Sequence, residues 1–250
     1  MSFISYIIVT YNSNDHFPAI IDNIRKFTPL THEIIVIDNG SASRNYLQGD
    51  HVELLRSNTY FTHAVNVGLQ KINEESKYVI LVNPDVRIFP QTISIMLSEV
   101  ERQKADISGA LLIRPDLTIQ HGGGSEYDDL SDSEVMALTN HKHTYDKESL
   151  YDKIQYFPRE CRWVTGAFFL ITRSALNILG PLDEQYIHYK SDIEYCLRAR
   201  LHGMKVICSS AICLHFHKRS IKRHPFLGHY WTSLKYSYQW YRCLKRLEHP

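Results

Sequence analysis

Short apolar runs alternate with amphipathic segments along the first hundred residues. Residues 3–10 form a continuous apolar run that is typical of a buried strand. Residues 17–27 then place large apolar side chains on one helical face, with Asp15 as the expected N-cap. The same patterns predict further strands at 33–38, 51–56 and 77–83, and further helices at 62–73 and 90–101. This alternation predicts an α/β fold with a parallel sheet covered by helices.

The regular pattern stops at about residue 122 and returns after residue 160. The segment 122–160 is glycine-rich, then acidic, then mixed polar, and its periodicity is weak, so we interpret it as a variable insert. After it, the chain predicts a strand at 163–172, a helix at 191–202 that stops at Gly203, and a strand at 204–214.

The end of the chain has a different composition. Residues 223–250 are dense in aromatic and basic side chains, which predicts an amphipathic helical tail. We therefore expect one domain over residues 1–222 and an appended tail over residues 223–250.

Composition narrows the class of protein. A chain of 250 residues with 44% hydrophobic residues can bury one substantial core. Its 28 Lys and Arg nearly balance 27 Asp and Glu, so we expect no nucleic-acid partner. Five cysteines without a C-x-x-C pair are typical of reduced core thiols. With neither a signal-like start nor a run of about 18 apolar residues, a cytoplasmic location is expected.

Polar residues follow three of the predicted strands at the point where each strand ends. The first strand ends in T-Y-N at 10–12, the second in D-N-G-S at 38–41, and another in N-P-D at 83–85. Ligands of open α/β sheets bind at the carboxyl ends of the strands. The sequence therefore predicts a polar ligand site at this edge of the sheet.

Two of these strand ends carry a carboxylate. Asp85 could anchor a divalent cation that bridges a diphosphate, because hard cations bind through one or two carboxylates plus substrate phosphates. Asp38 could accept hydrogen bonds from a base or ribose. The alternative for both residues is that the carboxylate only stabilises its own turn.

The second half of the chain adds an acid and a histidine. Ser191 and Glu194 have the spacing of a capping box, which would place Asp192 in the first turn of a helix. Asp192 is a candidate general base, unless its only role is to interact with the helix dipole. His215 precedes the basic residues of 218–223 and could complete a metal site, although a lone histidine is weak evidence.

Taken in order, these motifs resemble the family 2 inverting glycosyltransferases, and in particular their rhamnosyltransferase-like branch. The resemblance runs from about residue 3 to residue 220. The motifs that carry it are I-I-V-T-Y-N, I-V-I-D-N-G-S, N-T-Y-F-T-H-A-V-N-V-G-L, V-N-P-D, W-V-T-G-A-F-F-L-I-T-R, L-D-E-Q-Y-I-H-Y-K-S-D-I-E-Y-C-L-R-A-R-L-H-G and L-H-F-H-K-R-S.

The resemblance implies a GT-A fold, with a central mixed, mainly parallel sheet flanked by helices, and an inverting reaction that requires Mn²⁺ or Mg²⁺. It also implies a role for each matching residue. Asp192 matches the general base, and Asp85 and His215 match the metal ligands. The nucleotide-binding positions are Thr10, Tyr11, Asn12, Asp38, Asn66 and Asn83. The positions beside the donor and acceptor sugars are Trp163, Gly166, Ala167 and Ser191.

Two positions depart from the family pattern. Asn83 stands where the family often has an acidic residue, and Ser191 replaces the usual acidic residue before the base. These departures support one alternative, a catalytically silent nucleotide-sugar-binding or scaffold module of a glycan-assembly complex. A nucleotide-sugar dehydrogenase is disfavoured because no G-x-G-x-x-G follows the first strand.

The family branch favours dTDP-rhamnose as the nucleotide-sugar donor, with UDP-sugars next. The expected acceptor is a hydroxyl of a cell-surface polysaccharide or of a lipid-linked glycan precursor, such as one linked to polyprenyl diphosphate. The variable insert at 122–160 is expected to lie on the acceptor side of the site. Residues 225–248 suit an interfacial helix on the inner face of the cytoplasmic membrane. The alternative is that these aromatic residues pack on the domain or on a dimer partner.

Overall fold

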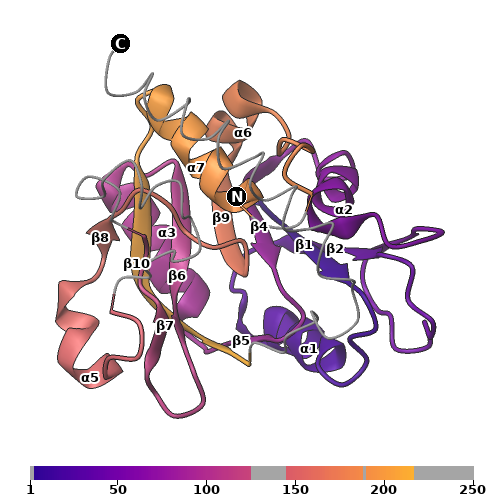
Figure 1. Ribbon diagram of the computed structural model, residues 1–250, viewed down its shortest axis with the longest axis horizontal. Helices are drawn as coiled ribbons and strands as arrows, with labels where there is room; N and C mark the ends of the chain where they lie inside the picture. Colours follow the sequence, from indigo (N-terminus) through magenta and orange to yellow (C-terminus); the bar gives the residue numbers. More distant parts are fainter. Residues whose placement is uncertain (1–2, 125–144, 188–189, 217–250) are drawn as a thin grey trace, which may run out of the picture.

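A mixed sheet forms the centre of the molecule in the computed structural model, which describes residues 3–124, 145–187 and 190–216 (Figure 1). The predicted tail and the middle of the predicted insert lie outside these ranges. The strands are β1 (Phe3–Thr10), β2 (His32–Asp38), β3 (His51–Leu54), β4 (Ser76–Val82), β5 (Val86–Ile88), β6 (Ile107–Ile113), β7 (Ile119–His121), β8 (Arg159–Glu160), β9 (Phe168–Thr172) and β10 (Val206–His215).

Within the described residues, the strand order is β3-β2-β1-β4-β9-β6-β10-β5, with β7 beside β6 and β8 beside β10. Strands β1 to β4 run parallel, and β9 lies antiparallel between β4 and β6. The pairing of β1 with β2 sets Thr10 opposite Asp38. The sheet is therefore mixed and mainly parallel, as the resemblance implies.

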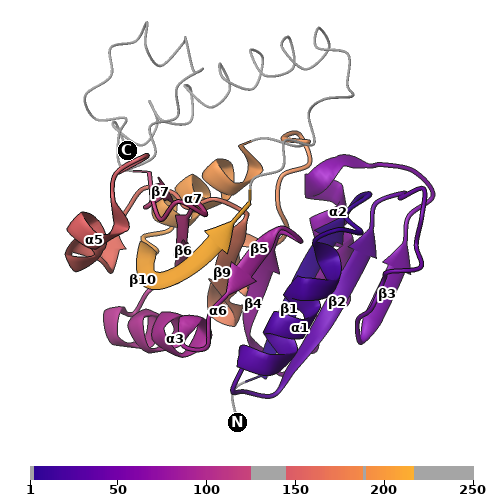
Figure 2. The ribbon, with the colours of Figure 1, turned by 90° about the horizontal axis from the view of Figure 1, so that it is seen from below.

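Helices cover both faces of the sheet (Figure 2). One face carries α1 (Phe17–Phe27) and α3 (Thr92–Gln103), whose buried side chains belong to the same core cluster as Ile4, Tyr6 and Ile8 of β1. The other carries α2 (Tyr60–Leu69), α6 (Arg173–Leu179) and α7 (Ser191–Leu201), whose buried side chains belong to the same core cluster as Ile7 of β1. The alternation along β1 follows from the two-residue period of a strand, so a run that is apolar throughout fills two cores.

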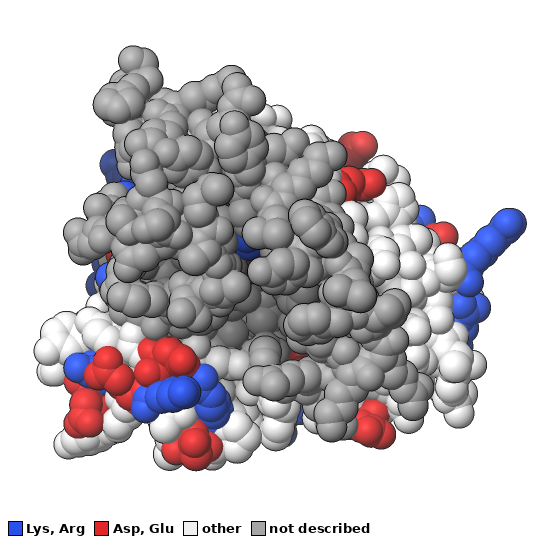
Figure 3. All heavy atoms as spheres, viewed as in Figure 1, with Lys and Arg blue, Asp and Glu red and all other residues white. Residues whose placement is uncertain are grey.

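The insert contributes short elements at the end of the sheet beside β7 and β8. Within its described part lie helix α5 (Leu150–Lys153) and the 3₁₀ turn η1 (Ile154–Tyr156). On the face drawn in Figure 3, acidic and basic side chains of the described residues are interspersed. In the part of the chain that the structure describes, no helix is long and apolar enough to cross a bilayer.

Several predicted element boundaries are wrong. Helix α1 has His16 as its N-cap, not Asp15. Strand β6 was not predicted, because Ser108 and Gly109 weaken the strand pattern of its first half. Gly109 is needed there, since a Cβ at this position would lie 2.5 Å from Cβ of Val164.

Candidate active site

The carboxyl ends of β1, β2 and β4 meet at one edge of the sheet, at the opposite end from residue 3 (Figure 2). Backbone hydrogen bonds tie the loops that leave these strands. Asn39 N donates to Thr10 O (2.8 Å), and Asn83 N donates to Ala167 O (2.9 Å). The polar residues at these strand ends therefore lie along one edge of the sheet. We call the carboxyl ends of β1, β2 and β4, with the loops packed on them, the rim.

Asp38 lies fully buried at the end of β2. Its carboxylate accepts hydrogen bonds from Ser41 N (3.2 Å) and from Nε of Arg44 (2.7 Å). The Arg44 guanidinium also donates to Leu55 O (2.9 Å) and remains partly exposed. Sequence reasoning missed Arg44, which compensates the charge of Asp38 where the nucleoside site is expected.

The T-Y-N turn is bound to the loop that follows Asp38. The hydroxyl of Tyr46 lies 3.1 Å from Oγ of Ser41 and 3.5 Å from Oγ1 of the buried Thr10. The Asn12 side chain accepts from Ala42 N (2.9 Å), and its backbone N donates to Ser41 Oγ (2.9 Å). These contacts give Thr10 and Asn12 internal partners, and they leave the ring of Tyr11 41% exposed at the rim.

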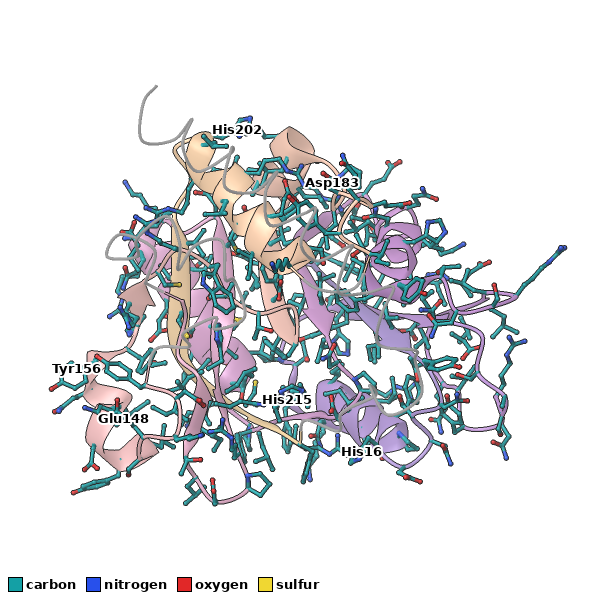
Figure 4. The ribbon with its side chains drawn as sticks, viewed as in Figure 1. His16, Glu148, Tyr156, Asp183, His202 and His215 are labelled. Carbon is teal, nitrogen blue, oxygen red and sulfur yellow. The ribbon has the colours of Figure 1, made fainter. Side chains whose placement is uncertain are left out.

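Asp85, in the turn between β4 and β5, lies beside His215 at the end of β10. Nε2 of His215 lies 3.2 Å from Oδ1 of Asp85, and Nδ1 of His215 lies 2.9 Å from Oε1 of Gln120. Phe216 N also donates to Asp85 O (3.1 Å), which fixes the end of β10 on this loop. Figure 4 shows His215 at the end of β10 on the side toward α1 and His16.

This pair fits a divalent cation. Nδ1 of His215 faces the acceptor oxygen of Gln120, and in the tautomer that this contact favours, Nε2 faces the Asp85 carboxylate. An imidazole nitrogen and a carboxylate oxygen both ligate divalent cations, and these two atoms lie close enough to share one. No group of three or more His, Cys, Asp or Glu ligands occurs among the described residues, so phosphate oxygens would have to supply further ligands.

Asp192 lies in the first turn of α7, with each carboxylate oxygen on a backbone amide. Gly166 N donates to Oδ2 (2.8 Å), and Ile193 N donates to Oδ1 (2.9 Å). Burial raises the pKa of Asp192, and these N–H groups only partly oppose the increase. The carboxylate is therefore a stronger base than an exposed aspartate.

The predicted capping box does not form. The N-cap is Lys190, which has a left-handed backbone (φ 71°) and no side-chain cap, and Ser191 is the first helical residue. Glu194 instead pairs with Arg198 four residues on (2.8 Å). Burial also lowers the pKa of the Lys190 ammonium to about 8.

The predicted strand at 163–172 begins only at Phe168, because the residues before it bond outside the ladder. Thr165 N donates to Nε2 of His121 (3.2 Å), next to the Gly166 amide that holds Asp192. The His121 ring lies 4.9 Å from that of Trp163, which is only 3% exposed. His121 and Trp163 therefore shape the loop beside Asp192, and sequence reasoning missed His121.

Asn66 joins α2 to the segment that leads to α7. Its amide donates to Leu182 O (2.9 Å) and to Oε1 of Glu184 (2.9 Å), and its oxygen accepts from Leu182 N (3.0 Å). The predicted contact of Asn66 with the nucleotide would have to coexist with these bonds. These bonds tie α2 to the chain that precedes α7.

The sheet order, the rim and its acidic residues define a GT-A glycosyltransferase domain. Residues 5–177 match the family model described as glycosyl transferase family 2, and the chain belongs to that family.

Its relatives include rhamnosyltransferases. The chain is 24% identical over 242 residues to N-acetylglucosaminyl-diphospho-decaprenol L-rhamnosyltransferase of Mycobacterium tuberculosis, covering 88% of this chain and 78% of the relative. It is also 24% identical to rhamnosyltransferase WbbL of Escherichia coli, covering 80% and 78%. The chain is therefore a rhamnosyltransferase-like member of the family.

Solved structures support the fold. A mannosyltransferase of Pyrobaculum calidifontis, in complex with GDP-Man and Mn²⁺, superposes with a TM-score of 0.57 at 13% identity, over 87% of this chain. The chain spans 58% of that protein, and 45% of another solved neighbour that matches it with a TM-score of 0.62.

Proposed function

We propose that this protein is a metal-dependent inverting transferase that moves rhamnose from dTDP-rhamnose to a hydroxyl of a lipid-linked glycan precursor. The observation that carries the proposal is the placement of Asp192, a carboxylate of raised pKa, on the rim that also holds the Asp85–His215 pair. The names of the two rhamnosyltransferase relatives support the donor sugar. UDP-sugars are the next donor class.

In this reaction Asp192 accepts the proton of the acceptor hydroxyl. The oxygen forms a bond to the anomeric carbon as the bond from that carbon to the nucleotide diphosphate breaks, and the electron pair leaves with the diphosphate. Attack from the opposite face inverts the anomeric centre. The amides of Gly166 and Ile193 hold the base in place, so little reorganisation is needed.

Asp85 and His215 are the residues that would hold the divalent cation, either Mn²⁺ or Mg²⁺. When bound, such a cation neutralises the charge that grows on the leaving diphosphate. Gln120 would orient the His215 ring so that Nε2 faces Asp85. Asn83, in place of a second carboxylate, makes the contribution of His215 and of the phosphates more important.

We also propose that the acceptor is linked to polyprenyl diphosphate and that the protein works at the inner face of the cytoplasmic membrane. The decaprenol in the name of the mycobacterial relative and the aromatic and basic composition of residues 225–248 support this. Deleting residues 225–250 should abolish flotation with anionic liposomes and leave nucleotide binding intact. Unchanged flotation would leave the tail as a packing or dimer element.

Calorimetric titration tests the donor site. The protein is titrated with dTDP, UDP, GDP and their sugars, with and without Mn²⁺, beside Asp85→Ala. We expect metal-dependent binding of dTDP-rhamnose that is lost in Asp85→Ala. Glu53→Ala is a matched control, since Glu53 is a partly exposed acid on β3 that pairs with Lys71. Absence of binding to every nucleotide would favour the silent scaffold module.

A further inference from the structure

The turn that enters α2 has an unusual backbone. Tyr60 is the first residue of this helix and has φ 65°, in the left-handed region that bulky residues rarely adopt. Such a conformation persists only where surrounding contacts impose it, and it is found disproportionately at functional sites.

Asn39 imposes this conformation from the end of β2. Its side chain, in a residue only 3% exposed, donates to Tyr60 O (2.9 Å) and to Oδ1 of Asn58 (3.1 Å). Its oxygen accepts from both N (2.8 Å) and Oγ1 (3.0 Å) of Thr59. Asn58 also accepts from Tyr60 N (2.8 Å). The whole hydrogen-bonding capacity of the Asn39 amide is therefore spent on three successive residues.

The close approach of the two loops is a second constraint on this turn. Gly40 has φ 82°, and a Cβ there would lie 2.6 Å from the backbone carbon of Ser57. Only glycine lets the backbone before Asn58 pack this closely on the end of β2.

The consequence of this turn is the position of Phe61. Its ring atoms Cε1 and Cζ lie 3.4 Å from the place where a Cβ on Gly166 would be, and Cβ of Asp192 lies 3.7 Å from the same point. The ring is only partly buried in the core. Phe61, Gly166 and Asp192 thus form one corner of the rim, contributed by α2, the loop before β9, and α7.

We propose that Phe61 is a specificity-determining residue whose ring supports the apolar face of the acceptor sugar beside Asp192. This inference rests on the proposed function. A phenyl ring offers no hydrogen bond, but its negative face attracts the weakly positive C–H groups of a pyranose. The acceptor is the sugar concerned, because its hydroxyl must reach the Asp192 carboxylate. The absence of a side chain at Gly166 leaves room for that approach.

Initial rates of the full chain test this assignment, with acceptor and donor varied separately. Phe61→Ala should raise the acceptor KM by tenfold or more and leave the donor KM within twofold, and Phe61→Tyr should restore the acceptor KM. Phe27→Ala is the matched control: Phe27 is another partly buried phenylalanine at the end of α1. It should match the wild type in both KM values.

Asn39→Ala distinguishes positioning from direct contact. It should raise the acceptor KM as Phe61→Ala does, and the double variant should be no worse than Phe61→Ala alone, because both changes remove the same support. An unchanged acceptor KM in folded Phe61→Ala would overturn the proposal, and so would an increase confined to the donor KM.

A binding measurement separates this inference from the proposed function. Saturation-transfer NMR with free N-acetylglucosamine should show contact of one C–H face in the wild type and loss of that contact in Phe61→Ala. If the wild type shows this contact yet transfers no sugar from any donor, the proposed function fails, and the assignment of Phe61 to acceptor-sugar binding stands. If N-acetylglucosamine makes no contact with the wild type, the assignment of Phe61 to acceptor-sugar binding is overturned.

Discussion

The two ends of the central sheet both carry buried acids, but they use them differently. At the amino end, Glu33 accepts hydrogen bonds from Oγ of Ser5 (2.5 Å) and from Asn73 N (2.7 Å), and lies 3.3 Å from Nε2 of His51. Ser5 in turn bonds to Ser76 at the start of β4. This network joins four segments of the chain to one another, so the Glu33 carboxylate has a structural role at this end of the sheet.

At the carboxyl end, by contrast, Asp192 accepts hydrogen bonds from the backbone N–H groups of Gly166 (2.8 Å), of Ile193 (2.9 Å) and of its own residue, and from the Thr165 side chain, and none of these donors is a cation. Burial keeps the pKa of Asp192 raised despite these neutral donors, so the carboxylate can take up the proton of a hydroxyl. The difference teaches that the number of acids at an edge says little. What matters is what surrounds each acid: Glu33 joins strands to one another, whereas Asp192 lies beside Gly166 and Phe61 at the rim.

The largest effect is expected from Asp192→Asn, which removes the proposed base. Transfer should fall by about 10²- to 10⁴-fold, the usual contribution of a positioned general base. Asn keeps the size of the side chain, so donor binding by calorimetry should persist. A variant that retains more than a tenth of wild-type kcat would show that another group takes the proton.

Gln120→Ala is expected to have the next largest effect. Loss of the bond to Nδ1 frees the His215 ring, and such supporting groups typically change metal affinity by about 10- to 100-fold. Titration with Mn²⁺ in the presence of nucleotide diphosphate measures this directly. Gln103→Ala is the control, since Gln103 accepts from Lys205 (3.1 Å) at the far end of α3. Equal Mn²⁺ affinity in both variants would contradict a metal role for His215.

The sequence predicted the nucleotide-binding half of the fold well. Strands β1, β2 and β4 are continuous apolar runs closed by polar residues, and the structure confirms them to within one residue at each end. The sequence pattern was less informative around β6, β7 and β9, where strands were missed or began later than predicted. There, chain geometry depends on contacts between distant residues, such as Gly109 with Val164, that no local pattern reveals.

The candidate site shows the same division. The candidate residues at the strand ends, such as Asp85, could be proposed from the sequence because the rule for α/β sheets needs only local pattern. Arg44, Gln120 and His121 were missed because each acts through a partner far along the chain or through a loop without periodicity. Asn39 was read only as part of a turn, although its side chain organises Asn58 and Tyr60.

A change of pH is expected to alter the rate of transfer more gradually than the Asp192 and Gln120 substitutions do. Asp192 must be ionised to accept a proton, and burial raises its pKa above the ordinary value of about 3.9. Activity should therefore be complete above the raised pKa and fall about tenfold per pH unit below it. The profile of kcat against pH measures this. A limb at or below the ordinary aspartate value would show that burial does not govern this base.

Glu33→Ala should have the smallest effect on transfer and a clear effect on stability. The change removes the carboxylate that accepts hydrogen bonds from Ser5 and from the Asn73 amide, and the loss of a hydrogen bond to a charged group costs about 1.5–3 kcal/mol. For a chain of this size, that cost lowers the melting temperature by roughly 2–4 °C per kcal/mol. Below the transition, kcat and both KM values should equal those of the wild type, because no partner of Glu33 lies on the rim. A fall in kcat without a fall in melting temperature would show that the two ends of the sheet are coupled, and the comparison between them would no longer hold.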